Sequence, residues 1–531
     1  MVLTKESRII WKRRIQGFWF EYSHNKVGIL GLGLLIFYIS LAIFAPYIAP
    51  YTAEEVRSSS ATRHADTFAL PEWITIFPQF SDWPRERIFP LDWIIVNATQ
   101  LPKSVTVEQL ADGYRFYYDA NKTKSKDNVT ITLLASLDYQ YAPGVLRQFT
   151  LTFSWKAAPS NTTKVVKFCV GKICVYGPET GTMDYILKLD MKTPNGTIYP
   201  IWDQNWFQVR DIDPRAPLKF WSSNSSATVT LTPLAELAVK LGYKSFETTR
   251  MVADMFSAKG NYTFIFTIIL RPGTVGGETV PIEQAKGTVE VSNAKFNTWG
   301  RVFGLLGTDG YRHDVFSQLV LGSRISIAIG IAAATLSVTF GLIVGIMAGY
   351  VGGIVDEILM RIVDILICIP VLPILLVLIA MFGYNVWYIV LIIAIFGWQG
   401  LSRVIRSQVL SLREMSFIES AIASGASKTY IMLRHIVPNV LPIALTSLVL
   451  SVPGAIILES SLSFLGFGDP FAPTWGRMLQ NAYDTNAFSP VNLAWWDILP
   501  PGLAITFLCL TFVFIGHAVD EIVNPRLRRR R

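Results

Sequence analysis

The sequence predicts a polytopic α-helical membrane protein with six transmembrane helices and a mainly β extracellular domain. Of its 531 residues, 51% are hydrophobic and only 16% are charged, whereas charged residues make up about 25% of a typical soluble domain. The apolar residues gather in long uncharged stretches, and one polar segment between them is rich in β-forming residues. This composition excludes a disordered chain, a coiled coil and a collagen-like repeat, and it argues against an ordinary soluble enzyme.

Membrane spans are expected where about 20 residues run without a charge, because a helix of that length crosses roughly 30 Å of hydrocarbon. The first uncharged stretch, 27–53, is too long for the apolar core of a signal peptide. The stretch 365–402 is too long for one helix, and Gly383-Tyr384-Asn385 divides it into two. The expected spans are 27–50, 324–350, 358–382, 386–403, 436–464 and 498–519.

The distribution of Lys and Arg gives the orientation, since cytoplasmic loops carry an excess of both. Six spans place the tail 1–26, the loop 404–435 and the tail 520–531 on one side, and all three are basic. On the other side, the loop 465–497 carries a single basic residue, Arg477. Both termini are therefore expected in the cytoplasm, and an amphipathic helix in the first tail is expected at the membrane interface. The terminal Arg run could instead bind nucleic acid, but membrane orientation already explains it, so no nucleic-acid partner is expected.

The segment 52–318 lies outside the cell in this orientation, and it alone contains Asn-X-Ser/Thr sequons. Glycan transfer needs an extracytoplasmic surface, so the segregation of the sequons agrees with the charge asymmetry. A Ser-, Thr- and Asn-rich β domain could also produce sequons by composition alone. The candidate glycosylation sites are Asn97, Asn121, Asn128, Asn161, Asn195, Asn224 and Asn261.

The same segment is long enough to bury a core of its own. Runs rich in Val, Ile, Thr, Phe and Tyr, broken by Gly, Pro and Asn, predict strands, and a helical stretch is expected at 235–257. This pattern favours a sandwich-like β domain. The expected strands are 129–136, 148–155, 164–175, 185–189, 262–270 and 287–291.

The four cysteines divide between the two parts of the chain. Cys368 and Cys509 lie in spans and are expected to pack as small hydrophobic residues. Cys169 and Cys174 stand on either side of Gly171-Lys172, a pair that suits a two-residue hairpin turn. The two cysteines would then face each other as a non-hydrogen-bonded pair, whose short spacing suits a disulfide. Two free thiols are the alternative.

No catalytic constellation is recognisable in the sequence. The five histidines show no metal-ligand spacing. The run Gly425-Ala426-Ser427-Lys428-Thr429 superficially resembles a phosphate-binding loop, but it lacks the glycine spacing of that motif and a preceding strand. The chain itself is therefore expected to be no enzyme and to bind no metal, cofactor or ATP.

The informative segment is the expected cytoplasmic loop 404–435. It contains the run Phe417-Ile418-Glu419-Ser420-Ala421-Ile422-Ala423-Ser424-Gly425-Ala426-Ser427, and Arg434-His435-Ile436-Val437-Pro438-Asn439 follows. Small residues along a short helix allow close approach of another protein. Gly425 permits a sharp change of direction, and Pro438 can begin the next span. A plain loop with one helix is the alternative.

This segment resembles the Glu-Ala-Ala…Gly motif of ATP-binding-cassette importer permeases, whose coupling helix docks on the ATPase subunit. Glu419, Ala421 and Gly425 match its spacing, with Ala426 next in the chain, and Pro438 stands at the family distance. Ser420 replaces the usual second-position Ala, a small-for-small change that should still pack.

Further segments resemble the dipeptide/oligopeptide permease group of that superfamily, C-type subunit. The resemblance covers about 1–52 and 300–531, and it leaves out the insert between the first two spans, where family members have a short loop. The family's Gly-Arg-Asp is here Tyr311-Arg312-His313-Asp314. The matching runs are Phe44-Ala45-Pro46-Tyr47-Ile48-Ala49-Pro50-Tyr51, Leu306-Gly307-Thr308-Asp309, Arg434-His435-Ile436-Val437-Pro438-Asn439, Ser461-Leu462-Ser463-Phe464-Leu465-Gly466-Phe467-Gly468 and Thr474-Trp475-Gly476.

The resemblance implies a type I ABC importer permease fold and a chain that forms half of a transmembrane path for di- or oligopeptides. It implies as partners a second related permease subunit in a heterodimer, two ATP-binding subunits that hold ATP and Mg, an extracellular solute-binding protein and membrane lipid. Oligosaccharides or nickel are the alternative cargoes within the group.

Glu459 is a carboxylate within the fifth span, where it would cost about 2.5–3.5 kcal/mol on insertion scales. It is expected to face a cavity or a partner helix, either lining the translocation path or accepting hydrogen bonds as a structural group.

Two other classes of protein compete with the importer. A cell-surface receptor or adhesion protein would use the β ectodomain, but it would have no use for a coupling-type loop. A stand-alone secondary transporter would show inverted repeats and several intramembrane charges, and neither is visible in the sequence.

Overall fold

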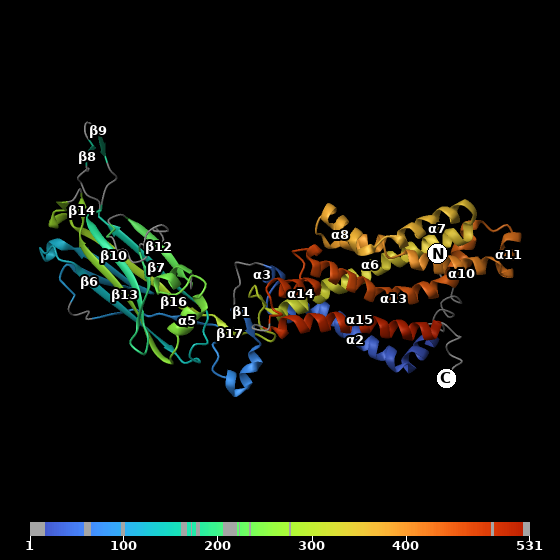
Figure 1. Cartoon of the computed structure of the whole chain (residues 1–531), viewed down its shortest axis with the longest axis horizontal. Coiled ribbons are helices and arrows are strands. Elements are labelled where there is room, and N and C mark those ends of the chain that lie inside the picture. The colour runs from blue at the N-terminus through green and yellow to red at the C-terminus, as the bar shows by residue number, and fades with distance from the viewer. Residues whose placement is uncertain are drawn as a thin grey trace. The chain divides into compact units, whose positions relative to one another are not determined.

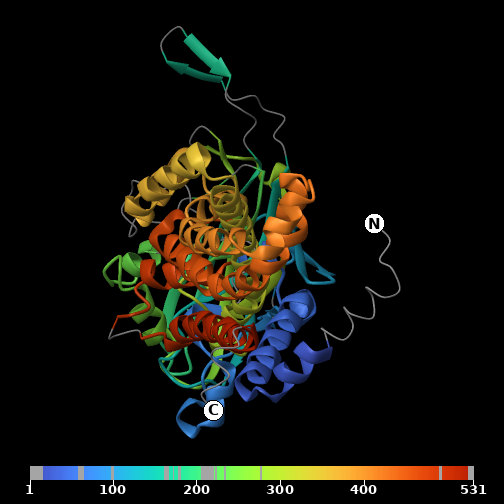
Figure 2. The same cartoon turned by 90° about the vertical axis from the view of Figure 1, so that its right-hand side faces the viewer.

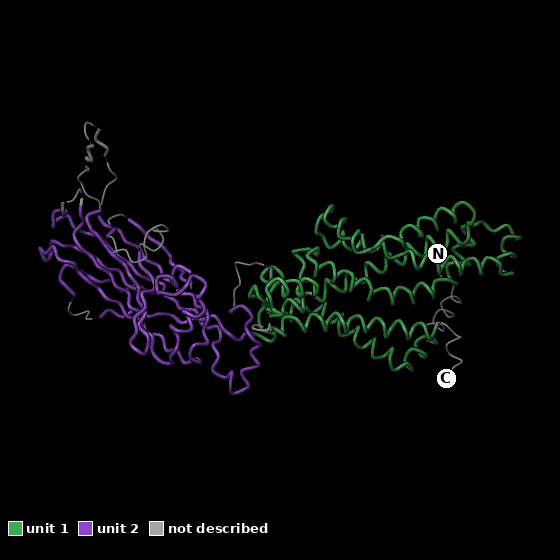
Figure 3. Tube along the Cα trace, in the orientation of Figure 1, with its two compact units in different colours: residues 1–63, 304–531 green, residues 64–303 purple. Residues whose placement is uncertain are grey.

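The computed structural model of the chain consists of two compact units (Figure 3). One unit combines Met1–Arg63 with Gly304–Arg531 and is helical, and the other, His64–Phe303, is built mainly from strands. This division agrees with the fold class that the sequence predicts. The residues that the structure describes are 16–57, 65–96, 101–160, 167–170, 173–176, 181–204, 220–221, 224–232, 235–275, 278–489 and 493–523.

The first unit is a bundle of mostly long, apolar helices (Figure 1). Its elements are α2 (Lys26–Ile48), α3 (Ala53–Arg57), α6 (Val315–Val351), α7 (Gly353–Cys368), α8 (Val371–Phe382), α9 (Val386–Ile395), α10 (Gln399–Arg413), α11 (Ser416–Ala423), α12 (Lys428–Ile431), the π-helical turn η6 (Met432–Ile436), α13 (Val437–Leu462), the π-helical turn η7 (Ser463–Phe467), α14 (Trp475–Asp484) and α15 (Trp495–Val523). Figure 2 views these helices nearly end-on and shows α2, in blue, beside α15, in red.

Among the described residues of this unit, four helices are long and apolar enough to cross a membrane: α2, α6, the continuous stretch Lys428–Phe467 and α15. Two bent pairs, α7 with α8 and α9 with α10, pass the same test jointly. Counting each bent pair as one span gives the six spans that the sequence predicts.

The third expected span, 358–382, is broken rather than straight. α7 and α8 meet at 92°. Pro370 has no N–H to donate, and its ring disfavours helical backbone at Ile369, which has ψ of 127°. The next division falls where the sequence places it, because Gly383 has φ of +97° and the Asn385 side chain caps α9.

Other elements run past their expected ends. The second span, expected at 324–350, already begins at Val315, and the first ten residues of the expected loop 404–435 belong to α10. Within the expected loop 465–497, residues 475–484 form α14 and 495–497 already belong to α15. Helix ends that rest on neighbouring elements are poorly marked in the sequence, since charge and polarity there look like those of a loop.

A stripe of glycines brings α6 close to α10. Gly341, Gly345 and Gly349 recur at every fourth residue, so they share one face of the helix. A Cβ atom at Gly345 would stand 2.7 Å from both the Ser402 carbonyl oxygen and the Ile405 Cβ, and the other two glycines are nearly as crowded. Small residues at this spacing allow helices to pack in a membrane, where no hydrophobic effect drives them together.

The second unit is a β-sandwich, as the sequence predicts. Its strands are β1 (Ala65–Leu70), β2 (Arg87–Pro90), β3 (Ile94–Ile95), β4 (Val105–Leu110), β5 (Gly113–Asp119), β6 (Val129–Tyr139), β7 (Phe149–Pro159), β8 (Lys167–Val170), β9 (Ile173–Tyr176), β10 (Met183–Lys192), β11 (Ile198–Asp203), β12 (Ser225–Leu231), β13 (Gly260–Pro272), β14 (Thr274–Val275), β15 (Glu278–Thr279), β16 (Lys286–Thr298) and β17 (Gly300–Val302). One sheet has the order β11-β10-β13-β6-β3 and the other β12-β7-β16-β5-β4, with β2 also paired to β16.

Alternating burial along the long strands creates one core between the two sheets. In β7 every second residue from Phe149 to Ala157 is buried. Phe153 of β7 packs its ring 5.5 Å from that of Phe266 in the opposite sheet. Each of the six expected strands lies on an observed strand or hairpin. The helical stretch expected at 235–257 is instead two short helices, α4 (Ala235–Lys240) and α5 (Thr248–Met255).

The strands β8 and β9 form the hairpin predicted from the cysteine spacing. Their register places Cys169 opposite Cys174 and Val170 opposite Ile173. The register is therefore confirmed, and the disulfide between the two cysteines stays a prediction.

The two ends of the β unit meet at what we call the root, the parallel pair of β1 and β17. Arg301 of β17 and Asp66 of β1 form an ion pair of 3.1 Å, with side chains only 10% and 2% exposed. Burial and the nearby Arg147 lower the pKa of Arg301 from its usual value, and Asp66 opposes that shift. Because the unit begins and ends at one place, it can be inserted between two neighbouring helices.

Candidate functional site

The predicted coupling loop is a compact helical projection, which we call the coupling segment (residues 414–430). α11 follows α10 after two residues, and α12 leads through η6 into α13. The candidate residues Glu419, Ser420 and Ala421 lie in α11, Gly425 and Ala426 form the turn after it, and Pro438 stands in the first turn of α13.

Gly425 ends α11 in a complete Schellman turn. Its φ of +79° lies in the left-handed region, which glycine adopts without steric cost. The Gly425 N–H donates to the Ile422 carbonyl at 2.9 Å, and the Ala426 N–H donates to the Ala421 carbonyl at 3.1 Å. Ala421 and Ala426 both pack against the apolar cluster beneath the helix. Ala421, Gly425 and Ala426 together form a tight turn that reverses the chain direction after α11.

α11 has one anchored face and one free face. Ile418 is fully buried among apolar side chains of α10 and α13. Phe417 and Ile422 are 43% and 53% exposed, and Glu419 is exposed beside them. A rigidly held helix that presents apolar side chains next to a charge is the kind of surface that binds another protein.

Ser420, which departs from the family motif, fits the helix without a cost in hydrogen bonds. Its hydroxyl donates to the Ser416 carbonyl at 2.8 Å, and the Ser424 hydroxyl donates to the Ser420 carbonyl at the same distance. Because each hydroxyl is hydrogen-bonded within its own helix, Ser420 changes the surface of α11 little compared with the alanine of the family motif.

His435 ties the coupling segment to the start of α13. Its ring lies 6.1 Å from the ring of Phe417 and 5.8 Å from that of Tyr430. The Asn439 side-chain amide donates to the His435 carbonyl at 2.6 Å. Pro438 has no N–H to donate, and it stands in the first turn of α13, directly after the π-helical turn η6. The run from Arg434 to Asn439 therefore connects α11 to the fifth span.

Glu459 lies near the opposite end of α13 and is only 1% exposed. The Ser463 hydroxyl donates to its carboxylate at 2.7 Å, the Ser460 hydroxyl stands at 3.4 Å, and Thr474 is a further hydrogen-bond partner. These partners belong to the chain's own bundle, so the geometry favours the structural alternative. A place along the translocation path stays a prediction.

The motif runs 461–468 and 474–476 meet around this carboxylate. Thr474 caps α14, with its side chain accepting from the Arg477 N–H at 3.3 Å. Trp475 is fully buried, and its indole N–H donates to the Leu319 carbonyl of α6 at 2.9 Å. The two runs therefore lock α13, α14 and α6 together, a link that no spacing in the sequence reveals.

The run from Leu306 to Asp309 forms a turn that joins α6 to α15. The Asp309 carboxylate accepts from the His313 N–H at 2.8 Å and from the Gln318 side-chain amide at 3.0 Å. The Thr308 carbonyl accepts from the Trp496 indole N–H at 3.2 Å. Sequence reasoning matched this run to the family without finding what it holds together.

The departure from the family's Gly-Arg-Asp lies in the same turn. Within the run 311–314, Arg312 has φ of +74°, a conformation that favours glycine. Asp314 keeps the family's Asp and caps α6, accepting from the Ser317 N–H at 2.8 Å. The cap is thus retained, while the turn before it is strained.

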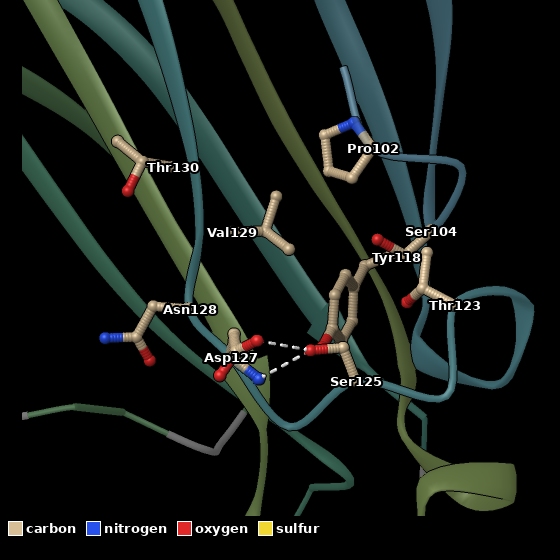
Figure 4. Close-up of a pocket in the computed structure, with 9 residues that line it drawn as sticks. All are labelled: Pro102, Ser104, Tyr118, Thr123, Ser125, Asp127, Asn128, Val129 and Thr130. Carbon is tan, nitrogen blue, oxygen red and sulfur yellow. Dashed lines mark hydrogen bonds between the residues drawn. The ribbon is translucent and has the colours of Figure 1, made fainter. Parts of the chain in front are cut away.

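A cavity of about 340 Å³ lies in the β unit, beside the sequon at Asn128 (Figure 4). Hydroxyl-bearing side chains line it, among them Ser104, whose buried hydroxyl has no hydrogen-bond partner in the described part of the chain. Burial raises the pKa of Tyr118 in its wall to about 12. The Ser125 hydroxyl donates to the Asp127 carboxylate at 2.8 Å. The lining therefore offers a small polar niche.

The candidate glycosylation sites that the structure describes all present an exposed asparagine. These are Asn121, Asn128, Asn195, Asn224 and Asn261. Asn97 and Asn161 lie outside the described residues. Within the described ranges, no group of three or more His, Cys, Asp or Glu side chains could hold a metal ion.

Two family models match the chain, and nearly all of their matched residues lie in the helical unit. The model of the family "binding-protein-dependent transport system inner membrane component" matches residues 341–529, and that of the "N-terminal TM domain of oligopeptide transport permease C" matches 14–66. The oligopeptide transport system permease protein OppC of Salmonella typhimurium is 42% identical over 225 residues, which is 42% of this chain and 72% of that protein. The chain belongs to the oligopeptide-type family of ABC permeases.

Two further relatives of the permease show the same pattern. OppC of Escherichia coli K12 is 40% identical over 225 residues, covering 42% of this chain and 72% of that protein. OppC of Haemophilus influenzae is 38% identical over 227 residues, covering 42% of this chain and 70% of that protein. The family models leave 67–340 unmatched, a range that holds most of the β unit. The permease is thus a multi-pass inner-membrane protein with an added β-sandwich.

Sequence reasoning found the turn and surface residues of the permease's coupling segment, but it missed their anchors. Ile418 looks like any apolar residue of a short helix, and His435 follows Phe417 by eighteen positions. No periodic pattern connects residues so far apart. Only the tertiary structure reveals that Ile418 joins the apolar cluster beneath α11 and that His435 lies against Phe417.

Proposed function

We propose that this permease forms half of the transmembrane path of an ATP-driven importer for oligopeptides. A second related permease subunit would form the other half, and two ATP-binding subunits would hold ATP and Mg. Support for the cargo comes from the relatives, which are named as oligopeptide transport permeases. Those names favour peptides over oligosaccharides or nickel.

The observation that carries the coupling role is the free face of α11. Phe417 and Ile422 project from a helix whose other face is buried through Ile418. Such side chains fit a groove on an ATPase subunit, where their apolar surface would leave water at about 25 cal/mol per Å².

The path from this face into the membrane is short and made of packed side chains. A movement of α11 presses on His435 through Phe417 and reaches α13 at Pro438. At its other end α13 is bound to α14 and α6 around Glu459. ATP-driven closure of the partner subunits can therefore tilt α13 as a unit and switch access from one side of the membrane to the other.

The orientation in this proposal places both termini in the cytoplasm and the β unit outside the cell. A solute-binding protein would then deliver cargo at the face where the β unit is attached. The basic tails and the exposed sequon asparagines support this orientation.

The test replaces Ile422 with Asp in the assembled complex. A charge at this exposed position leaves α11 anchored through Ile418, so the permease should insert and assemble with its partner permease. It should lose affinity for the ATPase subunits, and solute-stimulated ATP hydrolysis should fall sharply.

The matched control is Ser411→Asp, which adds the same charge to an exposed position of α10. It should leave hydrolysis much closer to the wild-type rate. Equal and full activity in both variants would exclude the free face of α11 as the docking site.

A further inference from the structure

An apolar loop projects from the root of the β unit. In this root loop (residues 71–83), the eight residues 73–80 carry no charge. Trp73, Ile76 and Phe77 are 42%, 79% and 51% exposed. Large apolar side chains gathered in the open on one short loop mark a contact surface.

The conformation of the root loop holds these side chains outward. It consists of two consecutive 3₁₀ turns, η1 (Glu72–Ile76) and η2 (Pro78–Phe80). The Phe77 N–H donates to the Ile74 carbonyl at 3.1 Å. Residues three apart eclipse each other in a 3₁₀ helix, so Trp73 and Ile76 lie on the same side.

The root loop is fastened to β17 at its base. Arg85 pairs with Glu72 at 3.1 Å and so closes the two ends of the loop. The Arg301 N–H donates to the Pro84 carbonyl at 2.7 Å, and its guanidinium lies 5.4 Å from the centre of the Trp83 ring. The loop therefore moves with the root and not independently of it.

The chain tethers the root close to the membrane-spanning helices. β17 ends at Val302, and Thr308, six residues later, is fully buried with its carbonyl bound to Trp496 at the start of α15. Six extended residues reach at most about 20 Å. Wherever the β unit points, its root stays within that distance of the end of a span.

We propose that Trp73, Ile76 and Phe77 insert into the interfacial layer of the lipid bilayer and anchor the root of the β unit to the membrane surface. The uncharged run 73–80 of the root loop combines Trp with Ile and Phe, and such residues settle at the lipid–water boundary. Lipid is always present within the reach of the tether. A soluble partner, by contrast, would leave these side chains in water whenever it dissociated.

The experiment measures the depth of the root loop in the whole permease complex reconstituted into liposomes. Ile76→Cys carries an environment-sensitive fluorophore, and the liposomes contain phospholipids with a nitroxide quencher near the headgroup. The fluorophore should emit at shorter wavelength than in water and should be quenched several-fold more strongly than a control. The parent chain gives the background from its four native cysteines.

The control label is Lys126→Cys, at the opposite end of the sandwich. β16 runs from Lys286, beside Asp119, to Thr298, beside Arg87, and its 13 residues separate the two ends by about 40 Å. Lys126 is exposed in the turn that follows β5.

Three results would overturn the proposal. The first is a water-like, unquenched label at 76, and the second is equal quenching at 76 and 126. The third is an unquenched label at 76 that becomes shielded only when the solute-binding protein is added, which would assign the loop to that protein. Should Ile76→Cys fail to assemble, Phe77→Cys carries the same measurement.

Discussion

At the scale of single residues, backbone conformation decides what the coupling segment tolerates. Gly425 needs its glycine for φ and not for space, because nothing lies within 4 Å of a Cβ built there. Glu459 presents the opposite case, since its surroundings and not its backbone determine its role. Substitutions at the two positions should therefore fail for different reasons.

Gly425→Val should uncouple the transporter. A left-handed conformation costs a non-glycine residue about 1–2 kcal/mol, and a β-branched residue more. The turn would shift and carry the free face of α11 with it, so solute-stimulated ATP hydrolysis should fall sharply while the spans still insert. Gly425→Asn is the matched control, because Asn tolerates this conformation and meets no clash. Wild-type coupling in the Val variant would contradict the prediction.

Glu459→Leu should destabilise the bundle, while Glu459→Gln should be tolerated. Leucine leaves the buried hydroxyls of Ser463 and Thr474 without their acceptor, at about 1–3 kcal/mol for each unpaired group. Glutamine keeps one acceptor oxygen. Thermal unfolding of the purified permease measures the difference. If Glu459→Gln is stable, as expected, but changes peptide uptake, then Glu459 lines the translocation path.

At the scale of elements, a strand can be predicted from the sequence when its alternation of apolar and polar residues is long enough. The long strands β6, β7, β13 and β16 alternate over 11 or 13 residues, so their period-two signal is strong. β1, β3 and β17 have two to six residues, and they become strands only because a partner lies beside them. Pro370 marks the place of the bend between α7 and α8, but the angle of 92° depends on how both helices pack.

The buried ion pair of the root should contribute far more than the exposed pair of the root loop. Asp66→Asn leaves Arg301 buried without its counter-charge, which costs about 3–5 kcal/mol in comparable pairs. Glu72→Gln breaks a pair whose side chains are about half exposed, and it should cost about 0–1 kcal/mol. Hydrogen exchange of β1 and β17 in the full chain should accelerate strongly in the first variant only. Equal protection in both variants would rule out the ion pair as the clamp of the root.

At the scale of the whole molecule, the β unit is an insertion that begins and ends at one root. The turn 306–309 belongs to the helical unit and is held by Trp496 and Gln318. The helical unit therefore fixes this turn through its own residues. We propose that the β unit helps to dock the solute-binding protein for delivery of the solute, and protection of the complex is the alternative.

Replacing 64–303 with a short flexible linker should leave the six spans and the ATPase contacts intact. This cut follows the boundaries of the compact unit and removes both strands of the root, so no buried charge is stranded. We expect the affinity of the membrane complex for its solute-binding protein to drop, as a binding titration would show. Uptake at the wild-type level after the deletion would exclude the docking role and leave the protective one.

The orientation can be tested with protease and tags on intact cells. Basic tails at both ends and sequons confined to the insert predict that external protease cleaves within 52–318 and spares a tag at either terminus. Glycans on the exposed asparagines should slow this cleavage, and enzymatic removal of the glycans should restore it. Labelling of a C-terminal tag from outside would overturn the orientation.

The sequence by itself determined the spans, the sandwich, the hairpin register of Cys169 and Cys174, and the family motifs. Each of these features can be predicted from residues that are close in the sequence, by their hydrophobicity, their periodicity or their spacing. The tertiary structure alone decided the pairing of Asp66 with Arg301, which are 235 residues apart, and the partners of Glu459. It also decided the anchoring of α11 through Ile418 and the exposure of the root loop. Local sequence sets which elements form, but burial and hydrogen bonding between distant residues depend on how those elements pack, and no local pattern encodes that.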